Sequence, residues 1–196
     1  HNARVSRVIR SAANPSRIES VEYLQGGARK TLSAERIIIA AFTVQSVRIL
    51  LSSATAQHSA PGNHSDKLGR YLMTHPAATV FGIFEEETYP HQGVSAGQLL
   101  SHDEYDDKAS PGGFGSSQWM IGHAIKPHDL LGYGTGRPDI SGSDLEPWLK
   151  LAARHLGNMT LVCEDIALPE NRITLSDKVD SEGISYAHTH HDLAPT

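Results

Sequence analysis

The stretch from residue 36 to residue 54 constrains the fold more than any other part of the sequence. It opens on an uninterrupted apolar run, Ile37-Ile38-Ile39, which is typical of a strand covered on both faces, as in a parallel sheet. The spacing then changes to intervals of three and four residues, which predicts one buried face of a helix. The residues on that face are Val44, Val47, Leu50, Leu51 and Ala54. Thr43 stands just before them and is the predicted N-cap.

A strand that runs directly into a helix predicts a candidate ligand site. Such a helix presents its free amide groups at the carboxyl edge of the sheet, where anionic groups of cofactors bind. Ala40 and Ala41 stand at this point, and their small side chains would let a ligand approach closely. The pattern alone leaves open a second interpretation, in which strand and helix only pack together and bind nothing.

The flanking segments add further strands. Residues 3–9 and 18–24 both show strand-like alternation, with Val21 and Tyr23 set between polar neighbours. Gly26-Gly27 predicts a turn after the second of these strands. Residues 30–33 then lead into the strand predicted for residues 36–41.

A run of Ser, Pro, Gly, Asn and His over residues 59–65 predicts a domain boundary, which divides the chain into residues 1–62 and 63–196. Beyond the boundary we expect a short helix over 67–73 and strands over 79–84 and 116–125. The acidic, Gly- and Pro-rich residues between these two strands, 85–115, are predicted to be a long surface excursion.

The C-terminal third begins with a helix signal, because Ser143 and Glu146 have the spacing of a capping box. Leu145, Trp148, Leu149, Ala152 and Leu156 would line one face of this helix, which is predicted to end at Gly157. Residues 159–166, 172–175 and 184–190 are then predicted to form three antiparallel strands joined by short turns. The predicted fold class is therefore α/β, or α+β.

Three shorter patterns have features of a nucleotide, metal or substrate site. The glycines of residues 132–136 lack the spacing and the following helix of a dinucleotide fingerprint, so this segment is interpreted as a flexible loop. His188, His190 and Asp192 would share one side of a strand, and a metal-dependent enzyme is kept as an alternative although no metal site is predicted. His123 lies in an apolar strand and is interpreted as a core histidine, with a substrate-facing position as the alternative.

Composition limits the classes of partner. The chain has 196 residues and a formal net charge of -5, and its Lys and Arg residues form no basic stripe, which argues against nucleic acid. Its longest apolar run, residues 37–42, is too short to span a bilayer. The single cysteine, Cys163, excludes an intramolecular disulfide and a cysteine metal site.

The segment from Glu35 to Leu51 resembles the second signature region of the glucose-methanol-choline flavoprotein oxidoreductases. In that family a buried strand ends in small residues and runs into a helix with a Ser/Thr-Pro-x-x-Leu-Leu pattern. Residues 65–76 are similar to the segment that follows in the family, often a Gly-x-x-Leu-x-x-His-Pro run, and residues 169–175 are like a hairpin of its substrate domain. The chain departs from the family pattern at three places: Phe42 replaces a usual glycine, Val47 a usual proline, and Ala54-Thr55 a usual Ser-Gly.

The resemblance implies an FAD-dependent enzyme that oxidises a CH–OH group of an alcohol, sugar or sugar acid and passes hydride to the flavin. Residues 1–62 would be part of a Rossmann-type FAD-binding domain, and residues 63–196 part of an antiparallel-sheet substrate domain with flanking helices. Carried over by position, Val5 would lie near the adenine, and Ala40 and Ala41 near the ribose and pyrophosphate. An electron-acceptor protein would be a further partner.

The same resemblance places the glycine-rich fingerprint before His1 and the catalytic histidine after Thr196. We therefore expect this chain to be an internal fragment that, by itself, neither holds FAD tightly nor oxidises alcohols. The alternative is a non-catalytic binding or interaction module derived from the same fold.

Overall fold

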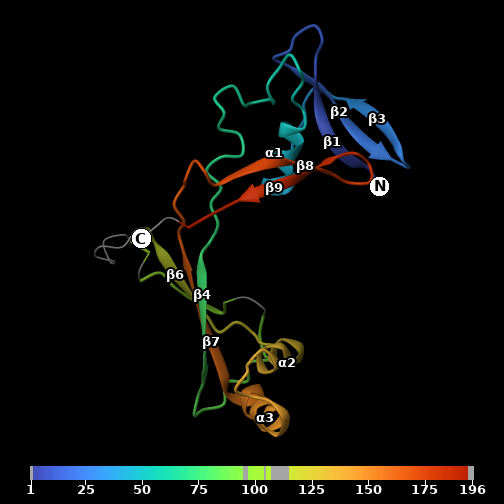
Figure 1. Ribbon diagram of the computed structural model, residues 1–196. Helices are drawn as coiled ribbons and strands as arrows, with labels where there is room; N and C mark the ends of the chain where they lie inside the picture. The colour runs from blue at the N-terminus through green and yellow to red at the C-terminus, as the bar shows by residue number, and fades with distance from the viewer. Residues whose placement is uncertain (1, 95–96, 104, 107–114, 194–196) are drawn as a thin grey trace. The chain divides into compact units, whose positions relative to one another are not determined.

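A computed structural model describes residues 2–94, 97–103, 105–106 and 115–193 of the chain. The chain divides into two compact units, the first made of His1–Met73 and Ile166–Thr196 and the second of Thr74–Asp165. Both units combine helices with antiparallel sheets, which confirms the predicted mixed class (Figure 1). The boundary predicted at residues 62 and 63 lies inside the first unit, and the assignment of the two parts to FAD binding and substrate binding stays a prediction.

The strands are β1 (Arg4–Arg10), β2 (Ile18–Gln25), β3 (Ala28–Ser33), β4 (Ala77–Ile83), β5 (Leu99–Ser101), β6 (Ser117–Ile121), β7 (Leu156–Cys163), β8 (Arg172–Val179) and β9 (Ser185–His190). The helices are α1 (Phe42–Leu51), α2 (Pro127–Thr135) and α3 (Leu145–His155), and a 3-10 turn, η2 (Gly142–Asp144), precedes α3.

The first unit contains a three-stranded antiparallel sheet in the order β1-β2-β3. Gly26 and Gly27 join β2 to β3 with φ of 60° and 75°, the backbone of a two-residue hairpin turn that glycine adopts without strain, so the predicted turn is confirmed. The more buried face of β2 carries Ser20, Glu22 and Leu24, whereas Val21 and Tyr23 are only half-buried. The alternating pattern thus predicted the strand correctly. The more buried face, however, is the one that carries the polar residues Ser20 and Glu22.

Hydrogen bonds and ion pairs to the Glu22 carboxylate offset the cost of burying this polar face. The register shifts between Val5 and Arg7 of β1, and the hydroxyl of the intervening Ser6 donates to Oε1 of Glu22 over 2.7 Å. Arg7 and Arg29 pair with the same carboxylate at 2.9 and 2.8 Å. Glu22 therefore links all three strands through charge-assisted bonds, as a buried charge requires.

Helix α1 contacts β1 and also β8 and β9. Its existence confirms the helix predicted from the change of period, but the buried residues are Arg48 and Ile49. The residues of the predicted face are only half-buried (Val44, Val47, Leu50 and Leu51) or exposed (Ala54). The predicted N-cap is wrong, because the helix begins one residue before Thr43 and Ala41 occupies the capping position without a side-chain bond. Phe42, where the family pattern has glycine, is 78% exposed and has a φ of 63°, a left-handed backbone that favours glycine.

The strand predicted for residues 36–41 is wrong. Residues 36–40 belong to none of the sheets of the described part of the chain, and Ile38 is 90% exposed. A central strand needs a neighbour on each side for its amide and carbonyl groups, and every strand pair in the described residues is antiparallel and lies elsewhere. The Rossmann-type arrangement therefore stays a prediction.

The short helix predicted for residues 67–73 is also wrong. Gly69 has a φ of 81° and Tyr71 a φ of 60°, and both values are incompatible with a right-handed helix. The segment instead runs beside the start of β8. The amide of Ile173 donates to the carbonyl of Gly69 over 2.7 Å, and the amide of Leu72 donates to the carbonyl of Asn171 over 2.9 Å.

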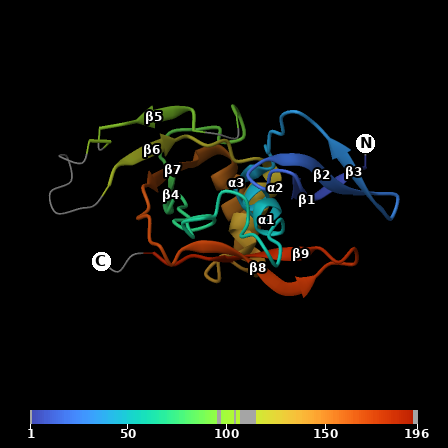
Figure 2. The same ribbon diagram turned by 90° about the horizontal axis from the view of Figure 1, so that it is seen from above.

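Strands β8 and β9 form an antiparallel pair, which confirms the hairpin predicted for the C-terminal part. The third predicted strand, residues 159–166, does not join this pair. It corresponds to β7, which pairs with β4 and β6 in the second unit. In that unit the four strands lie side by side in the order β4-β7-β6-β5 (Figure 2). The strands predicted for 79–84 and 116–125 are thereby confirmed as β4 and β6, with changed ends.

The excursion predicted for residues 85–115 is partly sheet, because β5 pairs with β6. Residues 95–96, 104 and 107–114 of that prediction lie outside the described residues.

Helices α2 and α3 of the second unit share a small apolar core formed by Ile125, Leu130, Ala152 and Leu156. Trp148 and Leu149 pack against it, so the apolar face predicted for α3 is confirmed. The capping box is not formed, since Asp144 stands at the N-cap without a side-chain bond, and the helix ends at His155 where β7 takes over. No helix of the described residues is long and apolar enough to cross a membrane.

The glycine segment 132–136 is not a loop. Residues 132–135 lie in α2 and Gly136 caps its C-terminus. A Cβ added at Gly134 would stand 2.9 Å from Cζ3 of Trp148, so the glycine lets the tryptophan ring of α3 approach the backbone of α2. Helix–helix packing thus explains this glycine.

Candidate functional site

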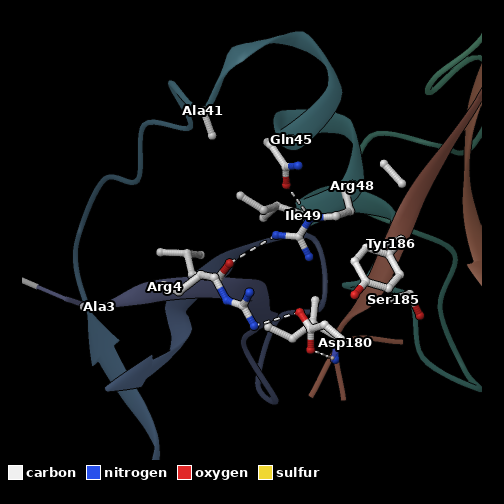
Figure 3. A pocket seen from close by; sticks show the side chains of 12 residues that line it. Ala3, Arg4, Ala41, Gln45, Arg48, Ile49, Asp180, Ser185 and Tyr186 are labelled. Atoms are coloured by element: carbon white, nitrogen blue, oxygen red, sulfur yellow. Dashed lines mark hydrogen bonds and ion pairs between the residues drawn. The ribbon is translucent and has the colours of Figure 1, made fainter. Parts of the chain in front are cut away.

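A pocket of about 550 Å³ opens in the first unit where β1, α1 and the β8–β9 hairpin meet (Figure 3). Strand β1 contributes Arg4 and Val5, and the hairpin contributes Asp180 and Tyr186, among others. The remaining wall comes from α1 and the residue before it, with Ala41, Gln45, Arg48 and Ile49.

Two of the three predicted cofactor-binding residues meet in this pocket. Val5 and Ala41 are distant in the sequence, yet both line the cavity. Ala40 is exposed and is not among the lining residues. That these residues contact a cofactor stays a prediction.

Arg48 is the buried charge of the pocket, with only 6% of its surface exposed. Its Nε donates to Oε1 of Gln45 over 2.6 Å, and its Nη2 donates to the carbonyl oxygen of Val5 over 3.3 Å (Figure 3). Burial lowers the pKa of the Arg48 guanidinium, the charge of Arg4 lowers it further, and the carboxylate of Asp180 acts in the opposite direction. The group stays protonated at neutral pH, because arginine is not deprotonated in proteins.

Asp180 fixes the hairpin turn and ties it to β1. Its Oδ1 accepts the amides of Glu182 and Ile184 at 2.9 and 3.0 Å, and its Oδ2 accepts Nη2 of Arg4 at 2.8 Å. The amide of Ile184 is the main cause of the lowered pKa of Asp180, and the amide of Glu182 and the charge of Arg4 act in the same direction against partial desolvation. Arg4 also forms an ion pair with Glu182.

His123 lies in the second unit, just after β6, and is half-buried. Its amide donates to Oδ1 of Asn158 over 3.1 Å, and Nδ2 of Asn158 donates back to its carbonyl over 2.9 Å. Its ring Nε2 is buried and has no hydrogen-bond partner in the described part of the chain, so it is not a satisfied core histidine. A substrate-facing position for His123 stays a prediction.

Two members of the alternative metal cluster lie close together. His190 and Asp192 approach each other, with Nε2 and Oδ2 3.4 Å apart. Across residues 2–94, 97–103, 105–106 and 115–193, however, no group of three His, Cys, Asp or Glu side chains is arranged to hold a metal ion.

The sequence predictions did not include Arg4, Arg48 or Asp180. A signal was available for Arg48: it follows Val44 by four residues and so shares the apolar face of the helix, where an arginine is unusual. No such signal marks Arg4 or Asp180, because their roles depend on contacts between distant segments.

Comparison with known proteins finds weak similarity to a dehydrogenase. No family model matches the chain. The chain is 25% identical over 172 residues to a 2-methyl-1,2-propanediol dehydrogenase from Mycolicibacterium austroafricanum. The match covers 82% of this chain and 30% of that relative, so the chain spans about a third of the relative's length.

Proposed function

We propose that this chain is part of an FAD-dependent oxidoreductase that acts on a CH–OH group of an alcohol, sugar or sugar acid. The observation that carries the proposal is the meeting of Val5 and Ala41 in one pocket, because the resemblance to the glucose-methanol-choline family assigns both to the cofactor. The similar dehydrogenase supports the class of reaction, since the substrate in its name is a diol.

The residues present fit the ADP half of such a cofactor. The pocket volume of about 550 Å³ lies within the range of roughly 300–1,000 Å³ that small-molecule sites occupy. The small side chain of Ala41 takes up little of the cavity. The carbonyl of Val5 supplies a hydrogen-bond acceptor and the guanidinium of Arg48 supplies a hydrogen-bond donor. When bound, FAD would supply the acceptor for the hydride removed from the alcohol carbon.

The chain's own residues would hold and orient the cofactor. Arg48 fixes the position of the Val5 carbonyl, and Asp180 fixes the hairpin that closes the other side of the pocket. In this proposal residues 1–62 belong to the FAD-binding domain and residues 63–196 to the substrate domain, where His123 faces the substrate. An electron-acceptor protein would reoxidise the flavin.

The visible absorption spectrum of the purified full-length protein tests the proposal. We expect flavin bands that bleach without air when 2-methyl-1,2-propanediol or another alcohol or sugar is added, and that return with an artificial electron acceptor. A colourless protein that takes up no added FAD would reject the oxidoreductase and favour the non-catalytic binding module. Flavin bands that no alcohol or sugar bleaches would reject the substrate class alone.

A further inference from the structure

A second pocket, of about 280 Å³, opens in the second unit between its sheet and the helices α2 and α3. Phe81 and Ile83 are two residues apart on β4, so their side chains stand on the same face of the sheet. Leu156 of β7 is the register partner of Ile83 and extends this apolar floor. Tyr133 of α2 and Trp148 of α3 line the pocket on the helix side. The volume is just below the roughly 300–1,000 Å³ of most small-molecule sites, so the pocket suits a single ring.

Two aromatic rings of this pocket are held in place and are still exposed. The ring centroids of Phe81 and Tyr133 lie 4.6 Å apart, with the ring planes inclined by 50°. Phe81 is nevertheless 40% exposed and Tyr133 43% exposed. Because the two rings fix each other, a ligand meets an aromatic surface that needs little reordering, and such preorganisation favours binding.

Arg137 is the charged residue of the lining, and it is already neutralised. Its Nε donates to Oδ1 of Asp139 over 3.0 Å, and its Nη2 pairs with Oδ2 of the same carboxylate. The guanidinium also lies 5.8 Å from the centroid of the Trp148 ring, which helps to fix its position. The pair as a whole is neutral, so the lining has no net charge that would attract an ion.

Hydrogen-bonding groups at the pocket remain available to a ligand. In the described part of the chain, neither Nη1 of Arg137 nor the hydroxyl of Tyr133 has a hydrogen-bond partner. An entirely apolar ligand would cover these donors without replacing their bonds to water, which costs free energy. A ligand with hydroxyl groups at its edge satisfies them, and each oxygen of Asp139 keeps a lone pair that accepts a bond in return.

We propose that this pocket binds the ring of a neutral monosaccharide. Carbon–hydrogen groups on one face of such a ring pack against Phe81 and Tyr133, while hydroxyl groups at its edge bond to the Arg137–Asp139 pair. A sugar acid is disfavoured, because Asp139 already neutralises the guanidinium. The inference goes beyond the proposed function and does not depend on FAD, because every lining residue lies in the second unit.

An NMR titration of the full-length protein, without air and with any flavin reduced so that no sugar is oxidised, tests this site with glucose, sorbitol and phenol. Sorbitol has the hydroxyl groups without the ring, and phenol has a flat ring with a single hydroxyl. Glucose should bind with a dissociation constant on the order of 1 mM, as the size of the ligand allows, and more tightly than either of the other probes.

Variants of two lining residues locate the bound sugar. Tyr133→Ala removes stacking surface and should weaken glucose binding about 2–10-fold, whereas Tyr133→Phe keeps the ring and should lose less. Arg137→Met removes a charged donor and should weaken binding by about 10-fold. Tyr105→Ala and Arg154→Met are the controls, because they change an exposed tyrosine and an ion-paired arginine of the same unit outside the pocket, and both should bind glucose like the wild type.

The outcomes separate this inference from the proposed function. Sorbitol or phenol binding as tightly as glucose would reject the sugar ring, and so would the absence of binding by all three probes. Glucose binding that neither Tyr133→Ala nor Arg137→Met weakens places the sugar elsewhere, which rejects this site and leaves the proposed function standing. Glucose binding that both variants weaken, in a protein that takes up no FAD, supports the site and rejects the proposed function. If Arg137→Met does not fold, the difference between Tyr133→Ala and Tyr133→Phe decides.

Discussion

Nη2 of Arg48 on α1 donates a hydrogen bond to the carbonyl oxygen of Val5 on β1 over 3.3 Å. A second bond ties β1 to the residues just after α1, because the amide of Val8 donates to the hydroxyl of Ser53 over 2.9 Å. Strand β1 is at the edge of its sheet, so these bonds satisfy backbone groups that would otherwise lack partners. Helix α1 thus both covers the edge of β1 and shapes the pocket beside it.

The hydroxyl of Ser53 should be a stabilising contact. It is buried, accepts the Val8 amide and donates to the carbonyl of Ile49 over 2.6 Å. Ser53→Ala leaves the Val8 amide unpaired, so we expect the free energy of unfolding to fall by about 1–3 kcal/mol. Urea denaturation measures this change. Ser16→Ala, at an exposed site, is the control, and equal midpoints for the two variants would contradict the prediction.

Glu22 should make stability depend on acidic pH. Burial raises the pKa of Glu22, but hydrogen bonds from Ser6, Arg7 and Arg29 outweigh it and hold the pKa below its usual 4.5. A lowered folded-state pKa stabilises the fold above the unfolded pKa, and this contribution is lost as pH falls through the folded value. The unfolding free energy should therefore decline below pH 4.5 and decline less in Glu22→Gln.

Urea midpoints measured as a function of pH test this dependence. Glu19→Gln removes an exposed carboxylate from the same strand and should keep the wild-type slope. A slope that is identical in Glu22→Gln and the wild type would show that the network does not set the pH dependence.

Gly69 should tolerate no side chain. A Cβ there would lie 2.4 Å from the carbonyl oxygen of Ile173 and 3.1 Å from Cγ1 of Val47, and its φ is 81°. Gly69→Ala therefore adds a backbone clash to the strain of about 1–2 kcal/mol that a left-handed residue costs. Gly62→Ala is a matched control, with a φ of 77° and no atom within 4 Å. Thermal denaturation should show a clearly larger loss for Gly69→Ala, and equal losses would disprove the clash.

Asn171 should be intolerant even of an isosteric change. It is fully buried; its Nδ2 donates to the carbonyl of Asp192 and its Oδ1 accepts the amide of Asp192, both at 2.9 Å. Asn171→Asp turns the donor into an acceptor facing a carbonyl, which should cost about 1–3 kcal/mol. Asn14→Asp keeps its acceptor bond to the Ser16 amide and should cost little. Urea denaturation compares the two, and a stable Asn171→Asp would refute the prediction.

Periodicity in the sequence predicted an element correctly where the backbone hydrogen-bond partners lie within the same segment. Helix α1 and the apolar face of α3 followed from spacing, because backbone bonds inside a helix are local and the apolar side is set by every third or fourth residue. The β2–β3 turn and the β8–β9 hairpin followed for a similar reason, since sequence neighbours pair. The strand expected at Ile37-Ile38-Ile39 failed, because a strand exists only beside another strand.

By itself, the sequence determined the mixed class and several local elements, among them α1, α3 and the β2–β3 turn. Only the tertiary structure decided that Gly69 lies against Ile173, that β7 joins β4, and that Arg48 is buried beside Val5. Each of these depends on contacts between residues far apart in the chain. Such contacts reflect the balance of burial, hydrogen bonding and charge across the whole unit, which spacing along one segment does not encode.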